Sequence, residues 1–137
     1  MDHKGTKTQR GELEEKVQET ARLAVDAAFQ VHSILGPGLT EKVYEACFLY
    51  ECTKRGMTVA RQVHVPIQYG EIRIEAGLRL DMILNDCIVI ELKAVESLNP
   101  LHKAQLITYL KLTGIRLGLL INFNVPMIKD GIQRIIL

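Results

Sequence analysis

The sequence lacks the features by which several protein classes are recognised. Its 17 Lys and Arg residues against 16 Asp and Glu leave a formal net charge of +1, so composition does not indicate a nucleic-acid binder. The most apolar late stretch, residues 112–123, includes Arg116 and is far shorter than a membrane span. No targeting segment, internal repeat or low-complexity segment is visible. These absences leave an ordinary globular chain, with no membrane partner expected.

The sequence has only three cysteines, Cys47, Cys52 and Cys87. They form no Cys-x-x-Cys pair and no His-x-x-x-His accompanies them, which argues against a zinc site. An odd number of cysteines without a signal peptide fits a reducing compartment, so we expect the protein to be cytoplasmic. We interpret all three as small core or half-buried residues rather than redox or nucleophilic groups.

The stretch around which the rest of the chain is organised is a predicted β-hairpin. Residues 78–84 and 88–93 alternate as strands do, and Asn85-Asp86 between them supplies turn chemistry. The period of two predicts one apolar face on each strand, made of Leu78, Leu80, Met82 and Leu84 and of Ile88, Ile90 and Leu92. Pairing Leu84 with Ile88 brings both faces to one core and puts Asp81 opposite Glu91.

The other face of this hairpin is predicted to present Arg79, Asp81, Glu91 and Lys93. One interpretation is a solvated sheet face with weak cross-strand ion pairs. The other is a hard-cation site in which Asp81 and Glu91 supply oxygens to Mg²⁺ or Mn²⁺. Ile83 and Val89 share this face, so the strands are expected to be covered on both sides, where unpaired carboxylates are costly. The pattern alone leaves both interpretations open.

The rest of the chain predicts an α/β protein with the order α-α-β-β-β-α-β-β. Residues 1–10 are expected to be a flexible N-terminus and residues 11–137 a single domain. The predicted helices are residues 11–35, residues 40–55 with Thr40 as N-cap, and a third helix starting at Asn99-Pro100. The further strands are a first one from residue 57 to Tyr69, with Pro66 marking an edge or a bulge, and residues 115–123 and 132–137.

Several motifs together resemble one nuclease superfamily. Asp81, ten residues, then Glu91-Leu92-Lys93 is similar to the central motif of the PD-(D/E)xK nucleases, with Leu80 where that name has proline. Gly38, Glu41 and Tyr44 match the signature of the GxxExxY family, a small branch of that superfamily. Gln105 and Tyr109 match the Gln-xxx-Tyr element of its recombination-type exonucleases. The resemblance covers nearly the whole chain from about residue 12 onward.

This resemblance implies a restriction-endonuclease-like core, a mixed β-sheet flanked by helices. It also implies a divalent-metal-dependent nuclease that hydrolyses nucleic-acid phosphodiester bonds, with DNA the expected substrate. Asp81, Glu91 and the Leu92 carbonyl would hold Mg²⁺ or Mn²⁺, and Glu41 would bind the metal directly or through water. Lys93 would give electrostatic or acid–base help at the phosphate.

The third helix and the C-terminal region are expected to contact the substrate. The resemblance assigns the Gln105 amide to a phosphate or a metal-bound water, and Tyr109 to the backbone or to ordering Gln105. His102, one turn earlier, could also meet a phosphate. From residue 99 onward one acid, Asp130, accompanies five cations, which predicts a locally basic face: Lys103, Lys111, Arg116, Lys129 and Arg134.

Two other functions stay open. The fold could hold nucleic acid without cutting it, which salt-dependent binding without products would indicate. It could also serve as a homodimeric interaction protein, built through a strand edge or through residues 135–137. A homodimer is also compatible with a nuclease that cuts two strands. The chain has little room for a specificity domain, so a targeting partner protein is a further expectation.

Overall fold

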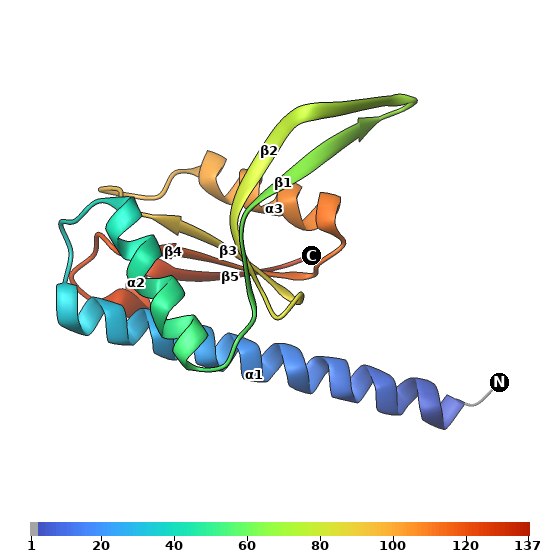
Figure 1. The fold of residues 1–137 in the computed structure, drawn as a ribbon, viewed down its shortest axis with the longest axis horizontal. Helices are drawn as coiled ribbons and strands as arrows, with labels where there is room; N and C mark the ends of the chain where they lie inside the picture. Colours follow the sequence, from blue (N-terminus) through green and yellow to red (C-terminus); the bar gives the residue numbers. More distant parts are fainter. Residues whose placement is uncertain (1–2) are drawn as a thin grey trace.

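A five-stranded mixed sheet lies between helices on both of its faces (Figure 1). This computed structural model describes the main chain of residues 3–137, and their side chains except those of 3–10, 12, 13 and 76. The elements in chain order are α1 (His3–Leu35), α2 (Glu41–Lys54), β1 (Val59–Tyr69), β2 (Ile72–Leu84), β3 (Ile88–Lys93), α3 (Pro100–Thr113), β4 (Leu117–Asn122), the short 3-10 helix η1 (Ile128–Gly131) and β5 (Ile132–Ile136). The predicted class and order are confirmed, with η1 as the unpredicted addition.

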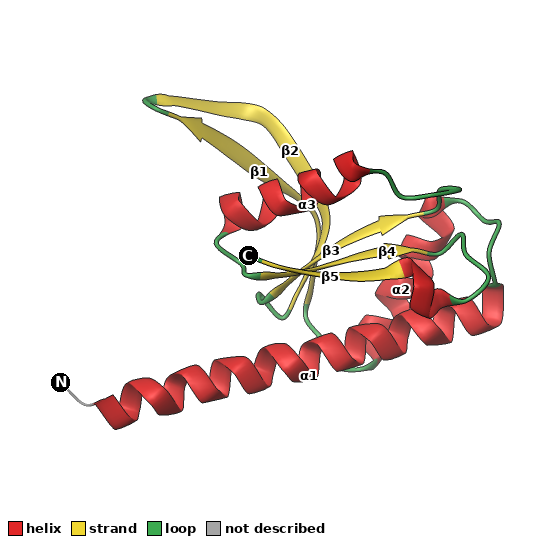
Figure 2. Ribbon diagram, turned by 180° about the vertical axis from the view of Figure 1, so that it is seen from behind, coloured by secondary structure: helices red, strands yellow, loops and turns green. Residues whose placement is uncertain are grey.

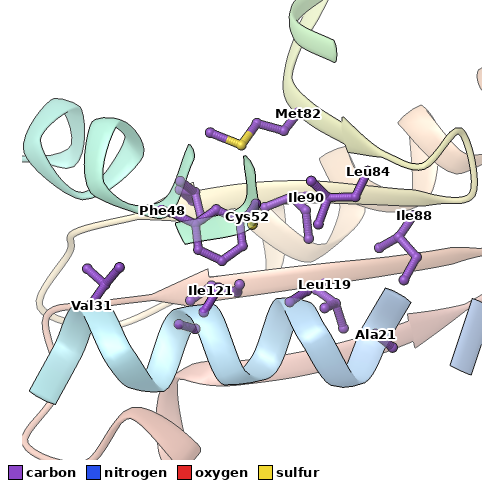
Figure 3. Close-up of a cluster of buried hydrophobic side chains, with 14 of the residues drawn as sticks. Ala21, Val31, Phe48, Cys52, Met82, Leu84, Ile88, Ile90, Leu119 and Ile121 are labelled. Carbon is purple, nitrogen blue, oxygen red and sulfur yellow. The ribbon is translucent and has the colours of Figure 1, made fainter. Parts of the chain in front are cut away.

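The strands follow one another across the sheet in chain order, from β1 to β5. β3 and β4 are parallel, as predicted for strands joined through α3, and the other neighbours are antiparallel. α1 and α2 cover one face and α3 covers the other (Figure 2). Two buried clusters result, and Figure 3 shows side chains of α1, α2, β2, β3 and β4 meeting in the larger one.

Helix α1 is longer than the sequence predicted. It begins at His3 rather than at residue 11, so residues 3–10 of the predicted flexible terminus are helical, while residues 1 and 2 lie outside the described residues. Apolar periodicity marks only the part that packs on the sheet, where Ala21, Ala24, Ala28 and Val31 are buried. The N-terminal part runs past the body of the molecule (Figure 2). Within residues 3–137, no helix is long and apolar enough to cross a membrane.

The cysteines lie where the sequence predicted. Cys52 is buried in the core against the sheet, and Cys47 and Cys87 are half-buried. Burial raises the pKa of the Cys52 thiol to about 12, which keeps it protonated and unreactive at neutral pH.

The predicted hairpin register is confirmed. Leu84 pairs with Ile88 and Met82 with Ile90, which leaves an odd connection of three residues, 85–87. Asn85 and Asp86 have φ angles of 50° and 56°, and Cys87 N donates to Leu84 O at 2.9 Å, as a primed turn requires. The Asn85 side chain also accepts the Thr58 N–H, which ties the turn to the start of β1.

The predicted apolar face of β2 is wrong in part. Met82 and Leu84 pack under α1 and α2, but Leu78 and Leu80 belong to the cluster under α3. β1 makes the same change, since Val59 packs with the first cluster and Val63 and Val65 with the second. Both strands therefore twist strongly at Asp81 and at the residue opposite it. Their apolar side chains lie on one face of the sheet on one side of this point and on the other face beyond it.

Candidate active site

The site lies where β2 separates from β3. The main-chain pairing of these strands ends at Met82 and Ile90, and beyond it two carboxylates replace the ladder. Asp81 N donates to Glu91 Oε1 at 2.9 Å, and Leu92 N donates to Asp81 Oδ2 at 2.8 Å. We call this reciprocal pair of hydrogen bonds the carboxylate clasp. It places Asp81 against Glu91, as the predicted register required.

Burial and nearby negative charge disfavour the charged forms of both acids. Glu91 is only 4% exposed, and burial first, then the charge of Asp81, raises its pKa to about 8. The pKa of Asp81 is also raised, mainly by burial and further by the charges of Glu41 and Glu45. Two adjacent carboxyls with raised pKa values are characteristic of a site that is completed by a cation or by a shared proton.

The donor set of the clasp suits a hard divalent cation. Each carboxylate uses one oxygen for a main-chain N–H, which leaves Asp81 Oδ1 and Glu91 Oε2 for another partner. In an extended strand the N–H and C=O of one residue point to the same side. Because Leu92 N–H points to Asp81, the Leu92 carbonyl also faces the gap between β2 and β3. These three oxygens fit the ligand set that the sequence predicted.

Lys93 follows Glu91 at the end of β3. Its charge lowers the pKa values of both carboxyls in the clasp, so its ammonium lies within their electrostatic reach. Lys93 pairs with Asn122 of β4, which is buried and bonds both main-chain groups of Val95 through its side chain. Asn122 therefore fixes the segment that leaves the site. Sequence reasoning missed it, although an amide at the end of an apolar strand was a usable signal.

Glu41 lies at the start of α2, where the loop from α1 positions it. Tyr44 is fully buried, donates to Gly36 O at 2.6 Å and accepts the Leu39 N–H at 3.1 Å. These bonds fold the loop onto the helix start. The charge of Glu41 raises the pKa values of both clasp carboxyls. Among the described residues, no three His, Cys, Asp or Glu side chains form a ready-made cation cluster. The role of Glu41 at a metal stays a prediction.

Two further residues, Glu45 and Gln62, belong to this region of the structure. Glu45, one turn after Glu41, accepts the Gln62 amide at 2.8 Å and an Arg61 guanidinium N–H at 3.3 Å. Gln62 lies opposite Asp81 between the pairs Arg61–Met82 and Val63–Leu80, and its φ of 49° is rare for a residue other than glycine. The i, i+4 spacing of two glutamates in α2 was the available signal.

The structure separates the two members of the Gln-xxx-Tyr element. Tyr109 is 2% exposed, and its hydroxyl donates to Arg79 O at 3.0 Å, two residues before Asp81. Burial, with the charges of Glu91 and Asp81, raises its pKa to about 12, so it is a neutral donor. Gln105 is exposed. Tyr109 thus braces β2 beside the clasp, and contacts of Gln105 and Tyr109 with substrate stay predictions.

The remaining predicted contacts are more dispersed. His102 Nδ1 accepts the Asn99 N–H at 3.2 Å in a capping box, so this histidine also has a structural role at the start of α3, and its contact with phosphate stays a prediction. Arg116 and Arg134 line a pocket of about 670 Å³ with Glu14 and Asp86, away from the clasp. Arg116 comes directly before Leu117, which pairs with Ile88 at the start of β3. Lys93 is at the other end of this strand. Arg116 and Arg134 therefore do not extend a basic face to the clasp, and substrate contacts of Lys103, Lys111 and Lys129 stay predictions.

Comparison with known proteins decides the family. A family model described as the PD-(D/E)XK nuclease superfamily matches residues 18–135. The chain belongs to the PD-(D/E)XK nuclease superfamily. No curated protein and no solved structure matches it. The mixed sheet with flanking helices agrees with this superfamily's fold, and its nucleases generally use divalent metal ions.

Membership gives the clasp a context. The motif for which this superfamily is named was matched in the sequence to Asp81, Glu91, Leu92 and Lys93, and the roles of these residues stay predictions. All four lie at the point where β2 leaves β3. A PD-(D/E)XK domain suggests a metal-dependent nuclease that acts on nucleic acid.

Proposed function

We propose that this PD-(D/E)XK protein is an active divalent-metal-dependent nuclease that hydrolyses phosphodiester bonds, with DNA the expected substrate and Mg²⁺ or Mn²⁺ the cofactor. The observation that supports this most is the carboxylate clasp. It holds the buried Glu91 and the half-buried Asp81 on facing strands, both with raised pKa values, and occupies only one oxygen of each with a main-chain N–H. The motif of Gly38, Glu41 and Tyr44 supports assignment to the GxxExxY branch.

The residues of the chain have separate tasks in this proposal. Asp81, Glu91 and the Leu92 carbonyl hold the cation, and Glu41 supports it directly or through water. A bound divalent ion supplies a Lewis acid that withdraws charge from phosphate and acidifies water. Lys93 places its ammonium beside the scissile phosphate and stabilises the negative charge that develops there. Tyr109 holds β2, and therefore Asp81, in place through the Arg79 carbonyl. Gln105 lies one turn before Tyr109 on α3 and is exposed, so its side chain contacts the substrate in this proposal.

A cleavage assay tests this function. The protein is incubated with labelled DNA and RNA, single- and double-stranded, in Mg²⁺ or Mn²⁺. Wild type should give products, and Asp81→Asn and Lys93→Ala should each reduce the rate about 10²-fold or more, because each removes charge that acts on the transition state. Asp130→Asn, an exposed acid in η1, is the matched control and should cut as wild type does.

The opposite results are equally clear. Asp81→Asn with the wild-type cleavage rate would exclude the clasp as the catalytic site. Metal binding and salt-dependent nucleic-acid binding without products from any substrate would instead indicate a non-cleaving module. A stable dimer that binds no nucleic acid would favour the interaction protein.

A further inference from the structure

The outer part of the β1–β2 hairpin projects from the sheet as a two-stranded arm (Figure 1). The arm comprises residues 63–69 of β1 and residues 72–80 of β2. β3 pairs with β2 only from Met82 to Leu84, so the arm has no neighbour on that edge, and β1 is the edge strand on the other. Isolated two-stranded ribbons are marginally stable in water. Such an arm is a feature that a binding partner would stabilise.

The register gives the arm two chemically different faces. One face is apolar from base to tip, and consists of Val63, Val65, Ile67 and Tyr69 with Leu80, Leu78, Ile74 and Ile72. Its base packs under α3, and its tip is exposed. The other face presents the pair His64–Arg79 and, beyond the bulge at Pro66, the pair Gln68–Arg73. These four side chains are all exposed.

The polar face begins at the clasp. Arg79 is the next alternate position outward from Asp81, and Gln62, opposite Asp81, is held by Glu45 of α2. The polar face of the arm therefore lies on the same side of the hairpin as α2, and it extends outward from the site. In a chain of net charge +1, it places two guanidinium groups and an imidazole in one row beside an acidic centre.

We propose that this polar face of the arm binds the phosphate backbone of nucleic acid and guides it to the Asp81–Glu91 clasp. The inference rests on the proposed nuclease function and adds where its substrate runs. The site is acidic, because Asp81 and Glu91 lie within the electrostatic reach of Glu41, so a phosphate that approaches it needs positive charge beside the site. Within the arm, Arg79 is the guanidinium nearest the site and His64 lies opposite it, and both side chains can donate hydrogen bonds to phosphate oxygens.

Arg73 extends the row toward the tip. Its Nε donates to Glu75 at 2.5 Å, in a pair whose side chains are 62% and 72% exposed. Exposed pairs of this kind are worth about 1 kcal/mol or less, so a phosphate can displace Glu75. Among the described residues, Arg79 has no carboxylate at ion-pair distance. Arg79 is therefore the main contact and Arg73 a secondary one.

Binding without metal tests this inference independently of catalysis. Fluorescence anisotropy is measured in EDTA, over a range of salt, with a short labelled DNA duplex and the matching single strand. Arg79→Gln should weaken binding about fivefold to tenfold and reduce the slope of log affinity against log salt by about one. Arg79→Lys keeps the charge and should restore the slope. Arg134→Gln on β5, at the opposite sheet edge, is the matched control and should bind as wild type does.

The outcomes separate the arm from the function. If Arg79→Gln kept wild-type affinity and slope while Asp81→Asn abolished cleavage, the arm proposal would be overturned and the nuclease would stand. If Ile72→Ser changed the oligomeric state and Arg79→Gln changed nothing, the arm would serve self-association and the proposal would be overturned. If wild type bound neither probe at low salt, the proposal would fail, and the cleavage assay alone would decide the function.

Discussion

The side chains of Asp81 and Glu91 each accept a hydrogen bond from the main chain of the facing strand. The main-chain N–H of Asp81 is satisfied by Glu91, and the N–H of Leu92, next to Glu91, is satisfied by Asp81. Replacing either side chain therefore removes an acceptor from a buried donor as well as a charge. Amide variants keep an oxygen for the N–H and remove only the charge, so Asp81→Asn and Glu91→Gln are cleaner tests than alanine.

The raised pKa of Glu91 predicts an unusual dependence of stability on pH. Its pKa is about 8 in the folded chain and near the ordinary glutamate value of 4.5 when the chain is unfolded. Between these values the folded state binds the extra proton, so the metal-free protein should lose stability as pH rises, by up to about 1.4 kcal/mol per pH unit. This stabilising contribution is complete below the pKa of Glu91 in the unfolded state. It is lost as the pH rises through the pKa of Glu91 in the folded state.

Urea unfolding in EDTA from about pH 5 to about pH 9 measures this effect. Glu91→Gln should flatten the pH dependence and be more stable than wild type at the upper end. Equal pH profiles of the two proteins would show that Glu91 does not titrate in this range.

The β2–β3 turn is the element that fixes the register of the site. Both of its central residues have positive φ, but their side chains differ: Asn85 bonds Thr58 and Thr20, whereas Asp86 is exposed. Asp86→Gly should therefore stabilise the protein by up to about 1 kcal/mol by removing backbone strain. Asn85→Gly removes the side-chain bonds and should destabilise it by about 1–2 kcal/mol. Urea midpoints compare the pair, and a stabilising Asn85→Gly would refute the anchoring role of this residue.

Helix α3 connects to the site through Tyr109. Removing its hydroxyl leaves the Arg79 carbonyl without this partner, so Tyr109→Phe should lower the free energy of unfolding by about 1 kcal/mol. Because this hydroxyl positions β2 rather than the reacting atoms, cleavage should fall far less than in Asp81→Asn, and Mn²⁺ affinity should fall with it. Thr108→Ala, an exposed change on the same helix, is the control. A rate loss equal to that of Asp81→Asn would give Tyr109 a direct catalytic role.

In the molecule as a whole, the features that local sequence patterns determine were predicted better than the contacts between segments distant in sequence. The hairpin register followed from the period of two and from Asn85-Asp86, because these signals lie within a few residues of one another. The coiling that moves Leu78 and Leu80 to the α3 side depends on how β1 and β2 twist together, and alternation does not encode it.

The same limit applies to the site. Asp81, Glu91 and Lys93 came together as predicted because one hairpin contains them. The bond of Glu45 to Gln62 joins a helix to a strand, and Asn122 supports the site from β4. Such pairings depend on the packing of layers, for which a single sequence gives no periodic signal. The motif of Gly38, Glu41 and Tyr44 marked an important loop, and the structure supplies the reason in the bonds of Tyr44.

A calorimetric titration with Mn²⁺ shows whether the clasp is a divalent-cation site. Wild type should bind Mn²⁺ at neutral pH with release of protons, because burial and repulsion keep the clasp partly protonated until a cation arrives. The double variant Asp81→Asn/Glu91→Gln should lose this binding, and Asp130→Asn should keep it. Equal Mn²⁺ affinity in wild type and the double variant, or no binding in wild type, would show that the clasp does not bind a divalent cation.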